Sequence, residues 1–298
     1  MKHILLAIHS SSHKIFQNNT IALIEGYKKI IKKHHLPIDI VSFCGQYDNS
    51  EHNYIETIKS DILDKRVADV LFDVMQKLVD KDYDIIIKTN TNTVINLPLV
   101  CMFCNSSDFN ESVIYSNICY QAYGDFNILF PSGMFTMASN NIWKQICGIK
   151  NTAIEFSDIR DGRSPEMGVY HTEEYSTEKL VWSGYSDEFL IGVCMKLLNI
   201  NMIALLSSTI SMAKREFFSY QINNDMFSFF DDIDPKYLCI NCKIDIECDL
   251  ELNTRDEIYR IEYEHYMIQS LCKIFEIYNP QFEDLENLIT SINYYDQI

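Results

Sequence analysis

Blocks of apolar and polar positions alternate along the first hundred residues. Short apolar runs at Ile4–Ile8, Ile38–Phe43 and Ile85–Ile87 predict buried strands. The longer stretches between them, Thr20–Lys33 and Asp64–Val79, repeat apolar residues at the helical period. Strands separated by helices of this length favour parallel pairing through right-handed crossovers. We therefore expect an α/β fold in which these three strands are neighbours.

The pattern becomes less regular after residue 100. Val113–Tyr115, Gly133–Ala138 and Met202–Leu206 indicate further strands. Asp187–Leu198 predicts a helix that is apolar on nearly every side and therefore buried. Between these elements, Glu155–Tyr185 is rich in Gly, Ser, Asp and Glu and predicts a long surface loop.

The composition changes again beyond about residue 215. Aromatic residues crowd positions 217–230, and two helices follow. Their start signals are the capping box Thr254-x-x-Glu257 and the pair Asn279-Pro280. We therefore predict a sheet domain over residues 1–215, with an aromatic-rich segment and a helical extension over 216–298 packed on it.

The overall charge and hydropathy exclude several classes of protein. The chain has 25 basic and 42 acidic residues, a net charge of −17, which argues against a nucleic-acid partner. Its one basic cluster, on the Thr20–Lys33 helix, is interpreted as a solvated helix face. No apolar run approaches the roughly 20 residues of a transmembrane segment, and Ile4–Ile8 is too short for a signal peptide. These features favour a cytoplasmic protein.

Ten cysteines raise the question of a metal site. Cys101-x-x-Cys104 and Cys239-x-x-Cys242 have the spacing of zinc ligands. No histidine stands close enough in the sequence to complete either pair, and Cys101 lies in an apolar stretch. Because free cysteine commonly packs as a small buried hydrophobe, buried thiols are favoured over zinc.

Three segments bring polar residues to places where chemistry is expected. Lys88-Thr-Asn90-Thr-Asn92 follows a predicted strand, and ligands of α/β sheets bind beyond the carboxyl ends of strands. Ser132-Gly133 leads into another strand, and Asp187-Glu188 opens the buried helix. The chain contains no glycine-rich dinucleotide or Walker motif, which argues against dinucleotide enzymes and P-loop NTPases.

In order and spacing these segments resemble the β-1,3-galactosyltransferase and Fringe-like glycosyltransferases, glycosyltransferase family 31. That family carries a Lys-x-Asp-Asp-Asp strand end, a Ser-Gly-Gly strand and a Glu-Asp-Val-x-x-Gly helix start. The resemblance covers roughly residues 60–205. It implies a GT-A-like, Rossmann-like fold with a mostly parallel central sheet. It also implies inverting transfer of a sugar from a nucleotide sugar, a UDP-sugar, to a glycan, a protein or another hydroxyl acceptor.

The resemblance also suggests roles for particular residues. The candidate catalytic residues are Glu188, which falls on the position of the general base, and Asp187. Acidic residues in a first helical turn have the alternative role of stabilising the helix dipole, by about 0.3–1 kcal/mol. Trp182 is a candidate for stacking on an acceptor sugar, or equally a core residue. The candidate donor-binding residues are His9, Ser10, Lys88, Asn90, Asn92, Ser132 and Gly133.

Two departures from the family pattern concern the metal. Asn90-Thr-Asn92 stands where the family has Asp-x-Asp, and hard divalent cations prefer carboxylate oxygen. The family's late His ligand is also missing, because no histidine occurs between His171 and His265. We therefore expect no metal cofactor, or only a weak manganese or magnesium dependence.

Without metal, cationic side chains would have to neutralise the leaving diphosphate. The candidates are Lys88, Arg160, Arg163, Lys214 and Arg215. The alternative function is a catalytically inactive GT-A-like protein that binds a sugar, a glycan or a protein partner.

Overall fold

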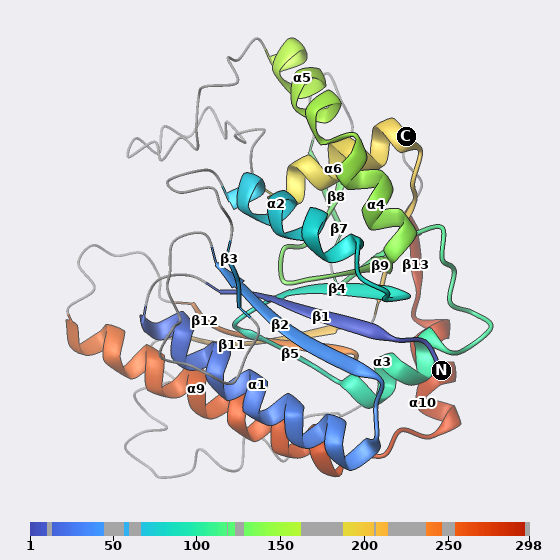
Figure 1. Cartoon of the computed structure of the whole chain (residues 1–298). Helices are drawn as coiled ribbons and strands as arrows, with labels where there is room; N and C mark the ends of the chain where they lie inside the picture. The colour runs from blue at the N-terminus through green and yellow to red at the C-terminus, as the bar shows by residue number, and fades with distance from the viewer. Residues whose placement is uncertain are drawn as a thin grey trace.

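The computed structural model of the chain contains one large and two small β-sheets with helices packed around them (Figure 1). It describes residues 1–10, 14–44, 57–59, 67–117, 119–122, 128–161, 187–205, 207–213, 237–245 and 254–295. Among these residues, no helix is both long enough and apolar enough to cross a bilayer.

The main sheet has eight strands and is mixed, with antiparallel pairs around β9 and at the β13 edge. In spatial order the strands are β13 (Asn293–Tyr295), β10 (Met202–Ala204), β6 (Ile114–Ser116), β9 (Phe135–Ser139), β4 (Ile85–Asn90), β1 (Ile4–His9), β2 (Ile38–Cys44) and β3 (Thr57–Lys59). β9 runs antiparallel to β4 and β6, and β13 runs antiparallel to β10. The remaining pairs are parallel.

The predicted arrangement of the first three strands is confirmed. β1 lies between β2 and β4 and is parallel to both, with Ile4 aligned to Ile38 and to Ile85. β4 continues to Asn90, three residues beyond the predicted end. Lys88 and Asn90 are therefore held by strand hydrogen bonding rather than by a loop.

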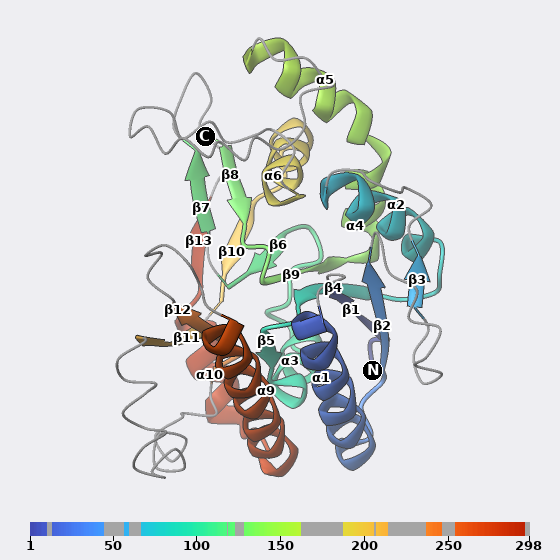
Figure 2. The same cartoon turned by 90° about the vertical axis from the view of Figure 1, so that its left-hand side faces the viewer.

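Helices cover both faces of this sheet, as the α/β pattern predicts (Figure 2). On one face lie α1 (Lys14–His34), α3 (Leu97–Cys104) and α9 (Thr254–Ile277). On the other lie α2 (Val67–Val79), α4 (Asn140–Gly148) and α6 (Asp187–Leu198). Because strand side chains alternate, Leu6 of β1 packs toward α1 while Leu5 and Ala7 pack toward α2 and α6.

The smaller sheets and the last helices complete the fold. β5 (Thr93–Ile95), β12 (Cys239–Asp245) and β11 (Ser207–Ala213) form one sheet, and β7 (Cys119–Ala122) pairs with β8 (Ile128–Pro131). α5 (Lys150–Asp161) follows α4, and α10 (Phe282–Thr290) contacts α3. The helical C-terminal part of the chain thus ends in β13, at the edge of the main sheet.

Some sequence predictions need correction. The predicted loop Glu155–Tyr185 is helical up to Asp161, within α5, and its remainder lies outside the described residues. The predicted strand Met202–Leu206 ends at Ala204. The last helix begins at Phe282, two residues beyond Pro280. The side chains of the Thr254 capping box and the aromatic segment 217–230 also lie outside the described residues.

The cysteine pairs are buried free thiols in this fold. Burial raises the pKa of Cys101 and of Cys239 to about 12. Within the described part of the chain, no three His, Cys, Asp or Glu side chains come together in a way that could hold a metal.

Candidate active site

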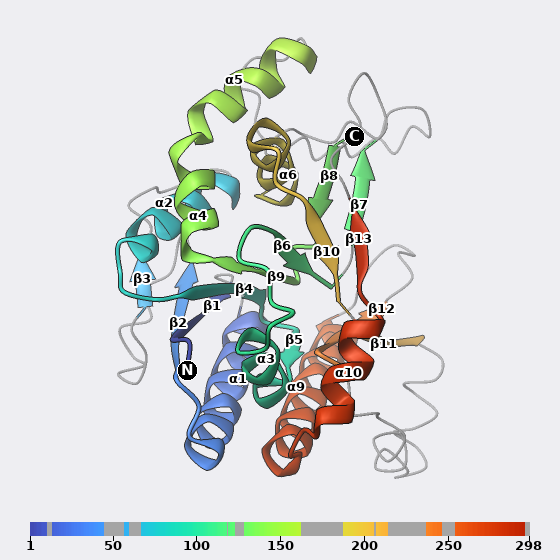
Figure 3. The ribbon, with the colours of Figure 1, turned by 90° about the vertical axis from the view of Figure 1, so that its right-hand side faces the viewer.

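The three candidate segments converge at the carboxyl end of β1 and β4. His9 and Asn90, the last residues of these strands, lie side by side in the sheet. Alternation places His9, Lys88 and Asn90 on the face that is covered by α6, because Ala7 and Ile86 of the same strands pack in that core. α6 begins above this edge and packs on β8 (Figure 3). Asp187 and Glu188 therefore meet the strand residues despite a separation of about a hundred positions in the chain.

Gly192 sets the close approach of α6 to β8. A Cβ atom at this position would lie 2.5 Å from Cβ of Phe130 and 2.7 Å from the carbonyl oxygen of Leu129. Glycine is therefore required for α6 to lie at this depth. Its spacing from Asp187 fixes where the first turn of the helix meets the sheet.

Lys88 and Asp187 form a buried ion pair. Lys88 Nζ lies 3.0 Å from Asp187 Oδ2 and donates a hydrogen bond of 2.6 Å to the carbonyl oxygen of Gly133. Lys88 is only 1% exposed and Asp187 only 6%. Burial alone would raise the pKa of Asp187, but the Lys88 charge and the hydrogen bonds outweigh it, so the pKa is lowered. Asp187 is thus an anion that holds Lys88 in place, and Lys88 joins α6 to the β8–β9 turn.

Glu188 sits against the backbone of Gly133. Any Cβ atom at Gly133 would overlap the Glu188 carboxyl group, which accepts a hydrogen bond from the Gly133 N–H. Burial and the neighbouring Asp187 charge raise the pKa of Glu188, and the opposing effects of Lys88 and Gly133 are smaller. A carboxylate with a raised pKa is a stronger base than a free one, which suits proton abstraction near neutral pH.

His9 is neutral at physiological pH in this environment. Desolvation and the Lys88 charge lower its pKa to about 4, although Asp187 opposes the shift. Its ring stacks on Phe43, with centroids 4.7 Å apart and planes 5° from parallel. His9 can therefore offer a ring face and a neutral hydrogen-bonding nitrogen, but not a positive charge.

Asn90 and Asn92 are both half-buried. The Asn90 N–H lies 3.4 Å from the carbonyl oxygen of Met134, and the Asn92 carbonyl accepts a 2.7 Å hydrogen bond from Cys242. The turn between β4 and β5 is thus fastened at one end to β9 and at the other to β12. It presents amide side chains at the strand edge.

These residues do not fit a divalent cation. Asn90 and Asn92 supply neutral oxygens, whereas such an ion at this place prefers carboxylates. The carboxylate of Asp187 is already paired with Lys88, whose ammonium group would repel a second cation. No reaction step is therefore routed through a metal.

Ser132 and Ser10 have structural contacts. The Ser132 hydroxyl accepts from the Met134 N–H at 3.2 Å, and its carbonyl accepts from the Thr136 hydroxyl at 3.1 Å. The Ser10 hydroxyl accepts a 2.9 Å hydrogen bond from Thr20 of α1. Both serines shape the backbone at the site edge, Ser132 in the β8–β9 turn and Ser10 after β1.

Sequence reasoning missed two residues that support the turn. Ser116 of β6 accepts a 3.0 Å hydrogen bond from the Ser132 N–H and donates one of 3.1 Å to Phe135. Thr136 lies opposite Lys88 in the sheet. Single polar residues inside apolar strands are the only sequence signal that could have marked them.

Several candidates cannot be placed. Trp182, Arg163, Lys214 and Arg215 lie outside the described residues. Arg160 belongs to α5, but its side chain is not described.

No protein-family profile and no curated protein matches the chain. Among solved structures, the apo form of the glycosyltransferase GlyE of Streptococcus pneumoniae TIGR4 is similar over 95% of this chain, with 11% identity and a TM-score of 0.39; this chain spans 66% of its length. A second GlyE structure, with the same coverage, has 10% identity and a TM-score of 0.41.

The galactosyltransferase LgtC, in complex with donor and acceptor sugar analogs, is similar over 91% of this chain and 95% of its own, with 7% identity and a TM-score of 0.43. These TM-scores are too low to support a function. Any assignment therefore rests on the residues of the site.

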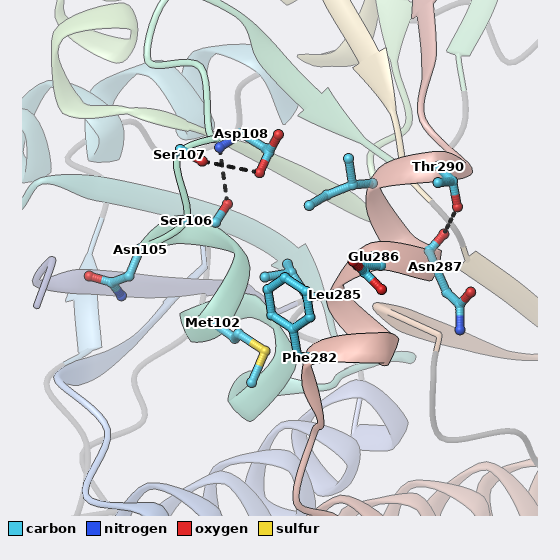
Figure 4. A pocket seen from close by; sticks show the side chains of 11 residues that line it. Met102, Asn105, Ser106, Ser107, Asp108, Phe282, Leu285, Glu286, Asn287 and Thr290 are labelled. Atoms are coloured by element: carbon cyan, nitrogen blue, oxygen red, sulfur yellow. Dashed lines mark hydrogen bonds between the residues drawn. The ribbon is translucent and has the colours of Figure 1, made fainter.

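A separate groove lies near the amino end of β1 (Figure 4). It has a volume of about 800 Å³ and lies between α3 and α10. Phe282 and Leu285 project into it from α10, and Asp108 and Glu286 supply its charged groups. The Lys2 N–H donates to Asn105 on its rim. Two carboxylates would repel a diphosphate, so this groove does not fit a nucleotide sugar.

Proposed function

We propose that the chain is a glycosyltransferase that transfers a sugar from a nucleotide sugar, a UDP-sugar, to a hydroxyl acceptor on a glycan or protein. The observation that carries this proposal is the Glu188 carboxyl group. It has a raised pKa and is held over Gly133 at the carboxyl edge of the parallel strands. This is the place where α/β folds bind their ligands.

In the proposed reaction Glu188 takes the proton of the acceptor hydroxyl while that oxygen attacks the anomeric carbon. The new carbon–oxygen bond forms as the bond to the donor phosphate breaks, and the electron pair leaves with UDP. The configuration at the sugar is inverted, because attack and departure take place on opposite faces. Asp187 and Lys88 are positioning residues for Glu188, because they hold the first turn of α6 against the β8–β9 turn.

We further propose that the reaction needs no divalent metal. The support is the neutral pair Asn90 and Asn92 together with the occupied carboxylate of Asp187. His9 and Asn90 would contact the donor at the strand edge, where they lie side by side. Basic side chains from elsewhere in the chain would then neutralise the negative charge of the diphosphate.

The test is the release of free UDP from a panel of UDP-sugars, with acceptors, in the presence and absence of EDTA. We expect the same release under both conditions. Loss of release with EDTA would contradict metal independence. Restoring carboxylates with Asn90→Asp and Asn92→Asp should create manganese binding, measured by calorimetry, because the two positions flank one turn.

A second candidate function is binding without catalysis. It is favoured by the contacts of Lys88, whose ammonium group is held by Asp187 and Gly133 instead of facing a donor diphosphate. Under this alternative no donor releases UDP, whereas a glycan still binds at the same edge. Glycan-array binding that is lost in Glu188→Gln, without any UDP release, would support it over the enzyme.

A further inference from the structure

Several exposed lysines lie on α1 and α9 of this otherwise acidic molecule. Five exposed lysines define this basic face: Lys28, Lys29, Lys32 and Lys33 of α1 and Lys273 of α9. Among the described side chains of the two helices, Glu25 is the one exposed carboxylate, and Glu276 is half-buried. The chain as a whole has a net charge of −17, so this concentration of lysine departs from its average composition.

The basic face is a continuous layer because the two helices are closely packed. Gly26 of α1 lies directly against Cys272 of α9, where any Cβ atom would overlap the thiol. The far ends of the helices are also tied, by a 2.9 Å hydrogen bond between His34 Nε2 and the carbonyl oxygen of Glu276. Figure 2 shows the two helices side by side, below the main sheet. Four of the five lysines thus lie on α1, and the fifth lies on the helix α9 that is packed against it.

Among the described residues, the main sheet separates this surface from the helices of the opposite layer. The thickness of a helix alone, about 10 Å, exceeds the range of a screened charge. Electrostatic interactions in solution fall off over a Debye length of about 8 Å at physiological ionic strength. The described charges of the opposite layer therefore affect these lysines only weakly.

We propose that the basic face docks on the surface of an anionic lipid bilayer. Lysines near such a surface attract its headgroups, and the effect grows with each one. At the end of α9, Ile277 is 74% exposed and provides an apolar side chain that can enter the lipid interface. A nucleic acid offers the lysines phosphates but no apolar layer for this isoleucine, so the bilayer is the better match. The proposal is independent of glycosyl transfer.

The experiment measures binding of the full chain to sedimented vesicles. One set contains phosphatidylcholine alone, and in the other part of it is replaced by phosphatidylglycerol. We expect binding to the second set only, weakened by added salt. The double variant Lys28→Glu with Lys32→Glu should bind the anionic vesicles at least about tenfold more weakly. Ile277→Ser should reduce binding less.

The matched control reverses two exposed lysines of the opposite layer, Lys77→Glu with Lys144→Glu, which changes the net charge equally. It should bind like the wild type. Circular dichroism checks that both double variants are folded. The proposal is wrong if wild-type protein ignores phosphatidylglycerol, or if the control loses as much binding as the basic-face variant. It is also wrong if the same lysines bind heparin or duplex DNA while vesicles are not bound.

Discussion

Lysine occurs at the carboxyl edge of the main sheet and on the basic face of α1 and α9. It is buried at the first place and exposed at the second. Lys88 is 1% exposed and its ammonium group is fixed between Asp187 and Gly133. Lys28 and Lys32 are exposed on a helix surface. Their contributions to stability should therefore differ, because a buried charge must be compensated by its partner, whereas an exposed charge is compensated by water.

This difference indicates how charge is divided in the molecule. At the carboxyl edge, charged groups position one another and tune the pKa of His9 and Glu188. On the basic face, the lysine side chains are exposed to solvent. Mutations at the first place should change folding and reaction, and mutations at the second should change binding alone.

The largest expected effect on stability comes from breaking the buried ion pair of Lys88 and Asp187. Lys88→Met leaves the Asp187 carboxylate buried without its cation, which should reduce the free energy of unfolding by about 3–5 kcal/mol. Urea denaturation measures it. Lys144→Met, on an exposed position, should change stability by no more than about 0.5 kcal/mol.

A double variant separates the loss of the pair from simple loss of packing. Lys88→Met with Asp187→Leu removes both charges, and it should recover part of the stability lost in Lys88→Met. If Lys88→Met is as stable as Lys144→Met, the pair is not a buried one.

The next largest effect is the pH dependence of folding stability that His9 causes. Its pKa is about 4 in the folded protein and about 6.5 when unfolded, so the unfolded chain binds more protons between these values. Stability should therefore be complete above pH 6.5 and fall as the pH drops toward 4, by at most about 3 kcal/mol. His9→Gln should flatten this slope in urea denaturation across the same pH range. An unchanged slope would mean that His9 is not held neutral.

A smaller effect on stability is expected at Gly192, where α6 packs closely on β8. Gly192→Ala brings a methyl group within 2.5 Å of Cβ of Phe130, and α6 must shift, at a cost of about 1–3 kcal/mol. Gly148→Ala, in α4, is the matched control, because its Cβ would meet nothing within 4 Å. That variant should be as stable as the wild type or slightly more stable. Thermal unfolding of the two variants gives the comparison, and equal melting points would refute the close approach of α6.

The central strands and most helices could be predicted because their periodicity is local. β1, β2 and β4 are apolar runs, and α6 has the predicted bounds Asp187–Leu198. Short strands such as β5 and β13 carry no such signal, since three residues acquire strand geometry only through partners that are distant in the sequence. The sequence predicts a loop from Glu155 because the stretch to Tyr185 is rich in Gly, Ser, Asp and Glu, whereas helix α5 continues to Asp161.

The sequence predicted which residues belong to the site better than it predicted the contacts between them. The sequence placed Lys88, Gly133 and Glu188 in one ordered set. The ion pair between Lys88 and Asp187 joins residues about a hundred positions apart and leaves no local pattern. The neutral state of His9 likewise depends on burial and on Lys88, which become evident only in three dimensions.

The account depends most on Glu188 as the general base. The measurement is turnover of wild type and of Glu188→Gln with a donor that releases UDP, with Glu111→Gln, an exposed carboxylate paired with Lys2, as the control. Glu188→Gln should lower turnover by about 10²–10⁴-fold while donor binding is unchanged, and wild-type activity should fall as acid protonates Glu188. Turnover of Glu188→Gln equal to that of Glu111→Gln would contradict the account.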